Sequence, residues 1–84
     1  MNYFEKLPVK TQTVNLSGND VRIDTAGLEA TLYVTDGDAY IKANSAVKNE
    51  DAFIIKNGTY FTLNGAFYIG GDNAVVRILY CRTI

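Results

Sequence analysis

Closely spaced turn signals constrain the fold of this 84-residue chain more than any other feature of its sequence. Clusters of glycine with asparagine, aspartate, serine or alanine recur along its length, at residues 17–20, 26–27, 36–38, 57–58, 64–65 and 70–73. Glycine and asparagine tolerate the positive φ that tight turns require, so each cluster predicts a reversal of the chain. The stretches between the clusters are too short for helices. The sequence therefore predicts an all-β protein.

Alternating apolar and polar residues support strands between these turns. In residues 10–16, for example, Gln12, Val14 and Leu16 share one face of a strand, opposite threonine and asparagine. The six-residue segment Ser45–Glu50 is too short for a stable helix and is predicted to be a loop. About eight short strands indicate a small antiparallel sandwich or a jelly-roll-like barrel. The predicted strands cover residues 10–16, 21–24, 30–35, 39–43, 52–56, 59–63, 66–69 and 74–82.

The length predicts one domain, over residues 9–84, preceded by an N-terminal arm of residues 1–8. The single proline, Pro8, marks the end of this arm. Because Tyr3, Phe4 and Leu7 make the arm apolar, we expect it to dock on its own domain or on a neighbouring chain.

A domain of this size buries only about 60–65% of the surface of its unfolded chain, so it needs additional support. Cys81 is the only cysteine, which excludes an intrachain disulfide, and histidine is absent, which argues against a zinc site. Neither a metal nor a cofactor is expected. Oligomerisation remains as the source of support.

Apolar residues are in excess in the second half of the chain. In residues 74–82 both faces of the predicted strand carry apolar side chains, interrupted by Arg77. One small core cannot absorb both sets, so we expect the second face to pack against other subunits. The alternative is that these residues simply cover the outer surface of the sheet. With the arm, the expected interface with other protein chains comprises Tyr3, Phe4, Leu7, Tyr60, Phe67, Tyr68, Leu79 and Tyr80.

The sequence contains no recognisable catalytic motif, and we expect the protein not to be an enzyme. The lack of histidine removes the commonest general base. Cys81 is better explained as a small apolar residue of the last strand than as a nucleophile. Asp36 and Asp38 flank Gly37 in a predicted hairpin turn and supply too few oxygens for calcium. The 70–73 cluster lacks the lysine of a phosphate-binding loop.

The charge and hydropathy of the chain argue against two classes of partner, nucleic acids and membranes. The formal net charge is −1 and the charged residues are scattered, so no basic stripe for nucleic acid is present. No apolar run approaches the ~20 residues that a membrane-spanning helix requires, and the N-terminal residues do not resemble a signal peptide. We expect a protein made in a reducing cytoplasm that binds neither nucleic acid nor membrane.

The C-terminal half resembles small structural proteins of tailed bacteriophages. The residues that carry the resemblance are the step Asn57-Gly58-Thr59, the strand Tyr60–Leu63, the aromatic and isoleucine-containing stretch Ala66–Gly71 and the closing stretch Ala74–Tyr80. The resemblance covers residues ~52–82. It implies a β-sandwich or jelly roll that decorates capsids or builds fibres and collars.

The same resemblance implies synthesis in a bacterial cytoplasm, a virion location and a homo-oligomer, often a trimer, that binds the major capsid protein or another virion protein. The expected interface residues would then contact other subunits or the capsid. A carbohydrate-binding module is the main alternative, in which Tyr33, Tyr40 and Tyr60 would stack on sugar rings. A small-barrel enzyme and a regulatory partner protein are further alternatives.

Overall fold

The computed structural model describes residues 5–83, which form an antiparallel sheet of seven strands. The predicted all-β fold is confirmed, and the predicted loop at 45–50 runs into a short 3₁₀ turn. None of the helical structure in residues 5–83 is long and apolar enough to cross a membrane. The elements are β1 (Lys6–Ser17), β2 (Val21–Asp24), β3 (Glu29–Asp36), β4 (Ala39–Lys42), η1 (Asn49–Asp51), β5 (Phe53–Ile55), β6 (Tyr60–Leu63) and β7 (Ala66–Thr83).

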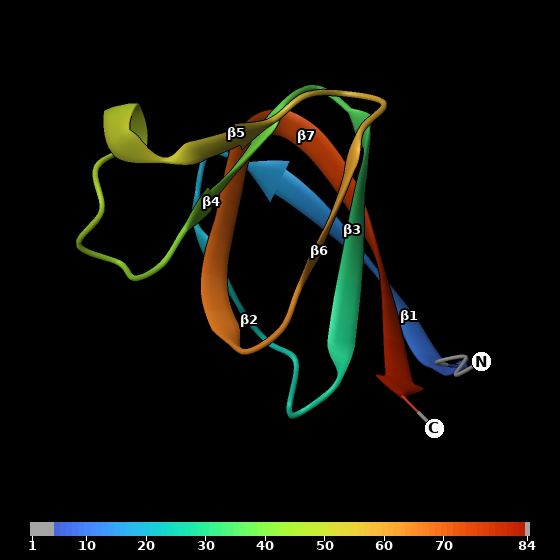
Figure 1. Ribbon diagram of the computed structural model, residues 1–84. Helices are drawn as coiled ribbons and strands as arrows, with labels where there is room; N and C mark the ends of the chain where they lie inside the picture. The colour runs from blue at the N-terminus through green and yellow to red at the C-terminus, as the bar shows by residue number, and fades with distance from the viewer. Residues whose placement is uncertain (1–4, 84) are drawn as a thin grey trace.

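Strand β7 runs through the whole molecule and organises the sheet. Its residues 72–83 pair with β1, and residues 75–81 also pair with β3 on the opposite side. Its first part is flanked in the same way by β2 and β4, while β6 pairs with β3 and β5 with β4. We call β1, β3, β6 and residues 72–83 the first half-sheet, and β2, β4, β5 and residues 66–71 the second half-sheet. Because β7 arches from one half to the other (Figure 1), the sheet curls into an incomplete barrel.

The predicted turn at 70–73 is wrong, because the chain bends there without reversing. Two strands expected at 66–69 and 74–82 are therefore one strand, β7. Asn73 adopts a positive φ of 54°, and Gly70 lies directly against the ring of Tyr40. A Cβ atom at Gly70 would come within 2.5 Å of two carbons of that ring. Glycine and asparagine occur where a strand bends as well as where the chain reverses, so these residues alone do not distinguish a bend from a turn.

Other predicted turns lie along the same bend. The Gly18 N–H donates to the Gly71 carbonyl oxygen at 2.9 Å, and a Cβ at Gly37 would come within 2.9 Å of the Asn73 carbonyl oxygen. The segments on either side of β7 thus change direction next to the bend of β7 itself. The two half-sheets face each other as a result, and their inner faces enclose the core.

The core lies between the half-sheets and takes one face of each strand. The expectation that both faces of residues 74–82 are buried is corrected here: Val75 is half-buried, and Arg77 and Leu79 are exposed, although Cys81 is buried. Alternation along β7 therefore follows the ordinary pattern of a sheet with one solvated face. The buried apolar residues of the core cluster are Val14, Leu16, Ile23, Ala30, Leu32, Val34, Ala39, Ile55, Phe67, Ile69, Ala74, Val76, Ile78 and Tyr80.

The start of β1 and the end of β7 form a two-stranded ribbon that projects from the body (Figure 1). Residues 6–8 pair with residues 81–83, so the predicted boundary between arm and domain after residue 8 falls inside β1. Residues 6–13 are all exposed, including Leu7. Tyr3 and Phe4 of the predicted arm lie outside the described residues.

Candidate functional site

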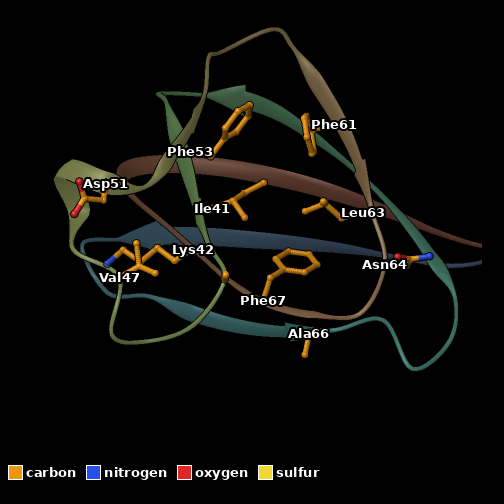
Figure 2. A pocket seen from close by; sticks show the side chains of 11 residues that line it. Ile41, Lys42, Val47, Asp51, Phe53, Phe61, Leu63, Asn64, Ala66 and Phe67 are labelled. Atoms are coloured by element: carbon orange, nitrogen blue, oxygen red, sulfur yellow. The ribbon is translucent and has the colours of Figure 1, made fainter.

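An apolar groove opens between the two half-sheets, on the side where β5 and β6 lie. It has a volume of about 500 Å³. Its walls come from β4, β5, β6 and the start of β7, and Val47 and Asp51 from the loop region close one end (Figure 2). The apolar side chains that line it are Ile41, Val47, Phe53, Phe61, Leu63 and Phe67.

Two phenylalanines form the rim of this groove. Phe53 of β5 is 58% exposed and Phe61 of β6 is 37% exposed. Their ring centroids lie 5.2 Å apart with an interplanar angle of 50°, within the range of favourable aromatic pairs. Each shares its strand face with a residue that points to the core, Ile55 or Leu63. These aromatic rings are therefore inner-face residues that the single chain leaves uncovered.

The groove exists because the barrel is incomplete. Strands β5 and β6 are the two ends of the strand path, and within residues 5–83 no strand pairs with the outer edge of either. The segment that joins them is fixed elsewhere: Asp38 accepts hydrogen bonds from the Asn57 N–H at 3.0 Å and from the Lys56 ammonium at 3.1 Å. These two bonds lower the pKa of Asp38 below its ordinary value.

A polar cluster anchors the loop at one end of the groove. The nearly buried ammonium of Lys42 donates to Asp20 at 2.9 Å and to the side-chain oxygen of Asn49. Tyr40 also donates to Asp20, at 3.1 Å. The hydrogen bond from Lys42 holds the pKa of Asp20 below its ordinary value, and burial raises the pKa of Tyr40. Each polar group in this cluster is satisfied by its neighbours, so the cluster positions the loop.

A second exposed surface lies on the outer face of the first half-sheet. Tyr60 is 69% exposed and its ring meets Tyr33 edge to face, with centroids 6.2 Å apart. Arg77 lies opposite Tyr33 in the register, and Leu79 follows two residues along the same face. The surface is a flat sheet face of mixed polarity with a shallow depression of about 290 Å³.

The structure divides the predicted interface residues among several places. Tyr60 and Leu79 share the outer face of the first half-sheet, whereas Tyr68 is half-buried on β7 in the second half-sheet. Phe67 and Tyr80 are corrected, because both are buried in the core of the single chain. Phe67 lines the inner part of the groove. Leu7 is exposed on the ribbon, and Tyr3 and Phe4 fall outside the described residues.

Tyr80 shows that the sequence of one strand does not reveal which of its two faces is buried. Its ring lies on the inner face of β7, where its hydroxyl donates to the side-chain oxygen of Gln12 at 2.7 Å and Lys10 covers the ring. Burial raises its pKa. A tyrosine can thus complete a core when one polar partner is in reach.

Sequence reasoning missed the rim of the groove. Neither Phe53 nor Phe61 is among the interface residues predicted from the sequence. In the structure both lie on the inner face of their strands, where burial is the ordinary expectation. Only the pairing of β5 and β6 with one neighbour each reveals that this part of the inner face is open.

Side chains that could act in catalysis or bind a metal are dispersed over the part of the chain that the structure describes. Among residues 5–83 no group of three or more cysteine, aspartate and glutamate side chains is placed to hold a metal ion. Cys81 is free and buried. The groove itself offers apolar contact with polar groups at its ends, an arrangement suited to binding.

No protein-family model matches the sequence, and no curated protein matches it. Among solved structures, the fold is similar to the crystal structure of protein NMB1881 from Neisseria meningitidis, with a TM-score of 0.63 over 95% of this chain and 87% of that chain. The two sequences are 14% identical over this alignment. The likeness extends to the fold alone, because one fold serves many functions.

Proposed function

We propose that this protein is a non-enzymatic structural subunit that works by packing against other protein chains, and that it associates with copies of itself. The observation that carries the proposal is the exposure of Phe53 and Phe61 on the inner face of the sheet. Contiguous apolar surface of this kind marks an interaction site. Burying it would supply the additional stabilisation that so small a domain needs.

The more specific form of the proposal is a virion component of a tailed bacteriophage or prophage, such as a capsid decoration, fibre or collar protein. The strand pattern of residues 52–82 motivates it. In this form the subunits would form a trimer and contact the major capsid protein, and the projecting ribbon with Leu7 would offer a second contact.

Sedimentation velocity of the full chain from micromolar to millimolar concentration tests the proposal. We expect an oligomer whose population rises with concentration. A chain that stays monomeric throughout would contradict self-association. For the virion form, mass spectrometry of purified particles after prophage induction should detect the chain in fixed ratio to the capsid protein, and its absence from such particles would remove that form.

Carbohydrate binding is the second candidate, and one observation favours it. Tyr33 and Tyr60 lie side by side on an exposed face beside Arg77, where a sugar ring could stack and form hydrogen bonds. Tyr40, the third expected stacking residue, lies apart from them on β4 of the second half-sheet. Titration with glycans, followed by the NMR shifts of Tyr33 and Tyr60, separates the candidates: shifts favour the module, and unchanged spectra favour the structural subunit.

A further inference from the structure

The outer edge of β6 carries no charged residue, unlike the outer edge of β1. β6 reads Tyr60-Phe61-Thr62-Leu63, with no charged residue and no proline. Between Lys56 and Asp72 the whole chain is uncharged. Natural proteins usually protect free edges with lysine, proline or a bulge, because unpaired N–H and C=O groups invite another strand. The edge of β6 carries none of these devices.

Both faces of β6 also present apolar surface to a partner. On the outer face Tyr60 is the most exposed of the large apolar residues, and on the inner face Phe61 stands at the rim of the groove. A strand that pairs with this edge must therefore bring apolar or neutral side chains on both of its faces. The sequence of β6 itself has this property.

We propose that two copies of the chain associate through their β6 strands, which pair antiparallel across a two-fold axis and join the first half-sheets into one continuous sheet. This inference deepens the self-association proposed above and rests on it, but it gives a two-fold dimer in place of the trimer of the virion form. Such an isologous contact uses the same surface on both copies, as a two-fold axis requires. Strand addition at a sheet edge is an established mode of protein recognition.

The alternation of side chains along each strand determines which residues meet in this dimer. Residues directly opposite each other in an antiparallel pair point to the same face of the sheet. For the two inner faces to lie on one side, Phe61 must face Phe61 or Leu63 of the second copy. The two grooves then open towards each other. Phe53 and Phe61 of both copies would line one shared apolar space, closed to water by the joined sheet.

Charge selects a second copy over a charged partner at this edge. A basic or acidic segment would gain no ion pair along residues 57–71, and it would lose hydration on approach. A neutral and apolar strand loses little on approach and gains backbone hydrogen bonds. The copy of β6 is such a strand, and it is present at the same concentration as its partner.

Sedimentation equilibrium of the full chain tests the inference with Thr62→Lys and a matched control. Thr62 is exposed on the outer face of β6 and would lie close to the two-fold axis, so the substitution brings two lysines together in the dimer. Thr13→Lys places the same charge on the same sheet face, on β1. We expect a dimer for the wild type and Thr13→Lys, and a dissociation constant raised at least about tenfold for Thr62→Lys.

A mixture of Thr62→Lys and Thr62→Glu provides a readout that a folding defect would not produce. Opposite charges at the axis should restore association in the mixed dimer, although each variant alone is weakened. The inference is overturned if Thr62→Lys associates like the wild type, if Thr13→Lys is weakened equally, if the mixture shows no rescue, or if the wild type is a trimer. A trimer would leave the proposed structural function standing, whereas a permanent monomer would overturn both.

Discussion

The two outer strands of the first half-sheet, β1 and β6, show how differently one protein treats two free edges. β1 is long and carries Lys6, Pro8 and Lys10, with an irregularity in its register between Pro8 and Lys10. β6 is short and uncharged. The lysines, the proline and the irregularity of β1 discourage strand addition, and β6 has none of these three features; only its shortness limits pairing at its edge. The proposed pairing would account for this difference, because β1 would remain an edge and β6 would be covered.

The inner residues of the two strands sharpen the contrast. Val14 and Leu16 of β1 are buried in the core, whereas Phe61 of β6 remains partly open to solvent. The single chain thus completes its core on the β1 side and leaves it incomplete on the β6 side. The proposed partner would therefore cover only one side of the molecule.

The largest expected effect comes from exchanging large for small residues on these two strands. Leu16→Ala should lower the free energy of unfolding by about 2–5 kcal/mol, because it leaves a cavity in a closed core. Phe61→Ala should lower the stability of the monomer by only about 1–2 kcal/mol, because 37% of this residue is already exposed to water. Urea unfolding at low protein concentration measures both. Equal losses would contradict the division into a closed and an open side.

A smaller effect is expected at the bend that sets the two half-sheets face to face. Gly70→Ala would force a Cβ atom into the ring of Tyr40. We expect a loss of about 1–3 kcal/mol, as for other overpacked sites. Thermal unfolding measures the loss, and the double variant Gly70→Ala with Tyr40→Ala should recover part of it. Without any recovery, contact with Tyr40 would not be the reason for glycine at this position.

We expect the stability of the protein to depend modestly on pH, because Asp20 belongs to the cluster that anchors the loop at the groove. Folding lowers the pKa of Asp20, so its contribution is complete above the ordinary value of 3.8 and is lost as the pH falls through the lower, folded-state value. In Asp20→Asn the loss of stability below pH 3.8 should be shallower than in the wild type. Urea midpoints measured from pH 5 downward test this, with Glu50→Gln as the control. An unchanged slope in Asp20→Asn would contradict the role of the Lys42 bond.

The smallest effect is expected from removing the protection of β1. The double variant Pro8→Thr with Lys10→Thr supplies a backbone donor and removes a positive charge from this edge. We expect additional weak association, visible by light scattering only at high concentration. If the variant scatters like the wild type, the protective features of β1 are not what keeps this edge free.

Much of this architecture could be predicted from the sequence, because strand alternation and turn residues are local signals. The strands of residues 21–24, 30–35 and 39–43 were predicted close to their observed bounds. The turn at 70–73 was wrong, since glycine and asparagine favour a bend as well as a reversal and only the pairing with β1 to β4 decides between them. Local sequence does not contain that information.

The candidate site was harder to predict, for a related reason. Phe67 and Tyr80 are expected at an interface but are buried, because both lie on β7, which has partner strands on both sides. Phe53 and Phe61 also lie on the inner face and are exposed, because they line the groove that the two half-sheets leave open between β5 and β6. Burial depends here on the position of a strand in the sheet, a property of the whole fold.

Hydrogen exchange of the wild-type chain, followed at low and high concentration, tests the difference between β1 and β6 most directly. If β6 is covered by a second copy, the backbone amides of residues 60–63 that point away from β3 should exchange more slowly as concentration rises. The amides on the free edge of β1 should exchange at the same rate throughout. Equal behaviour of the two edges at every concentration would contradict the account.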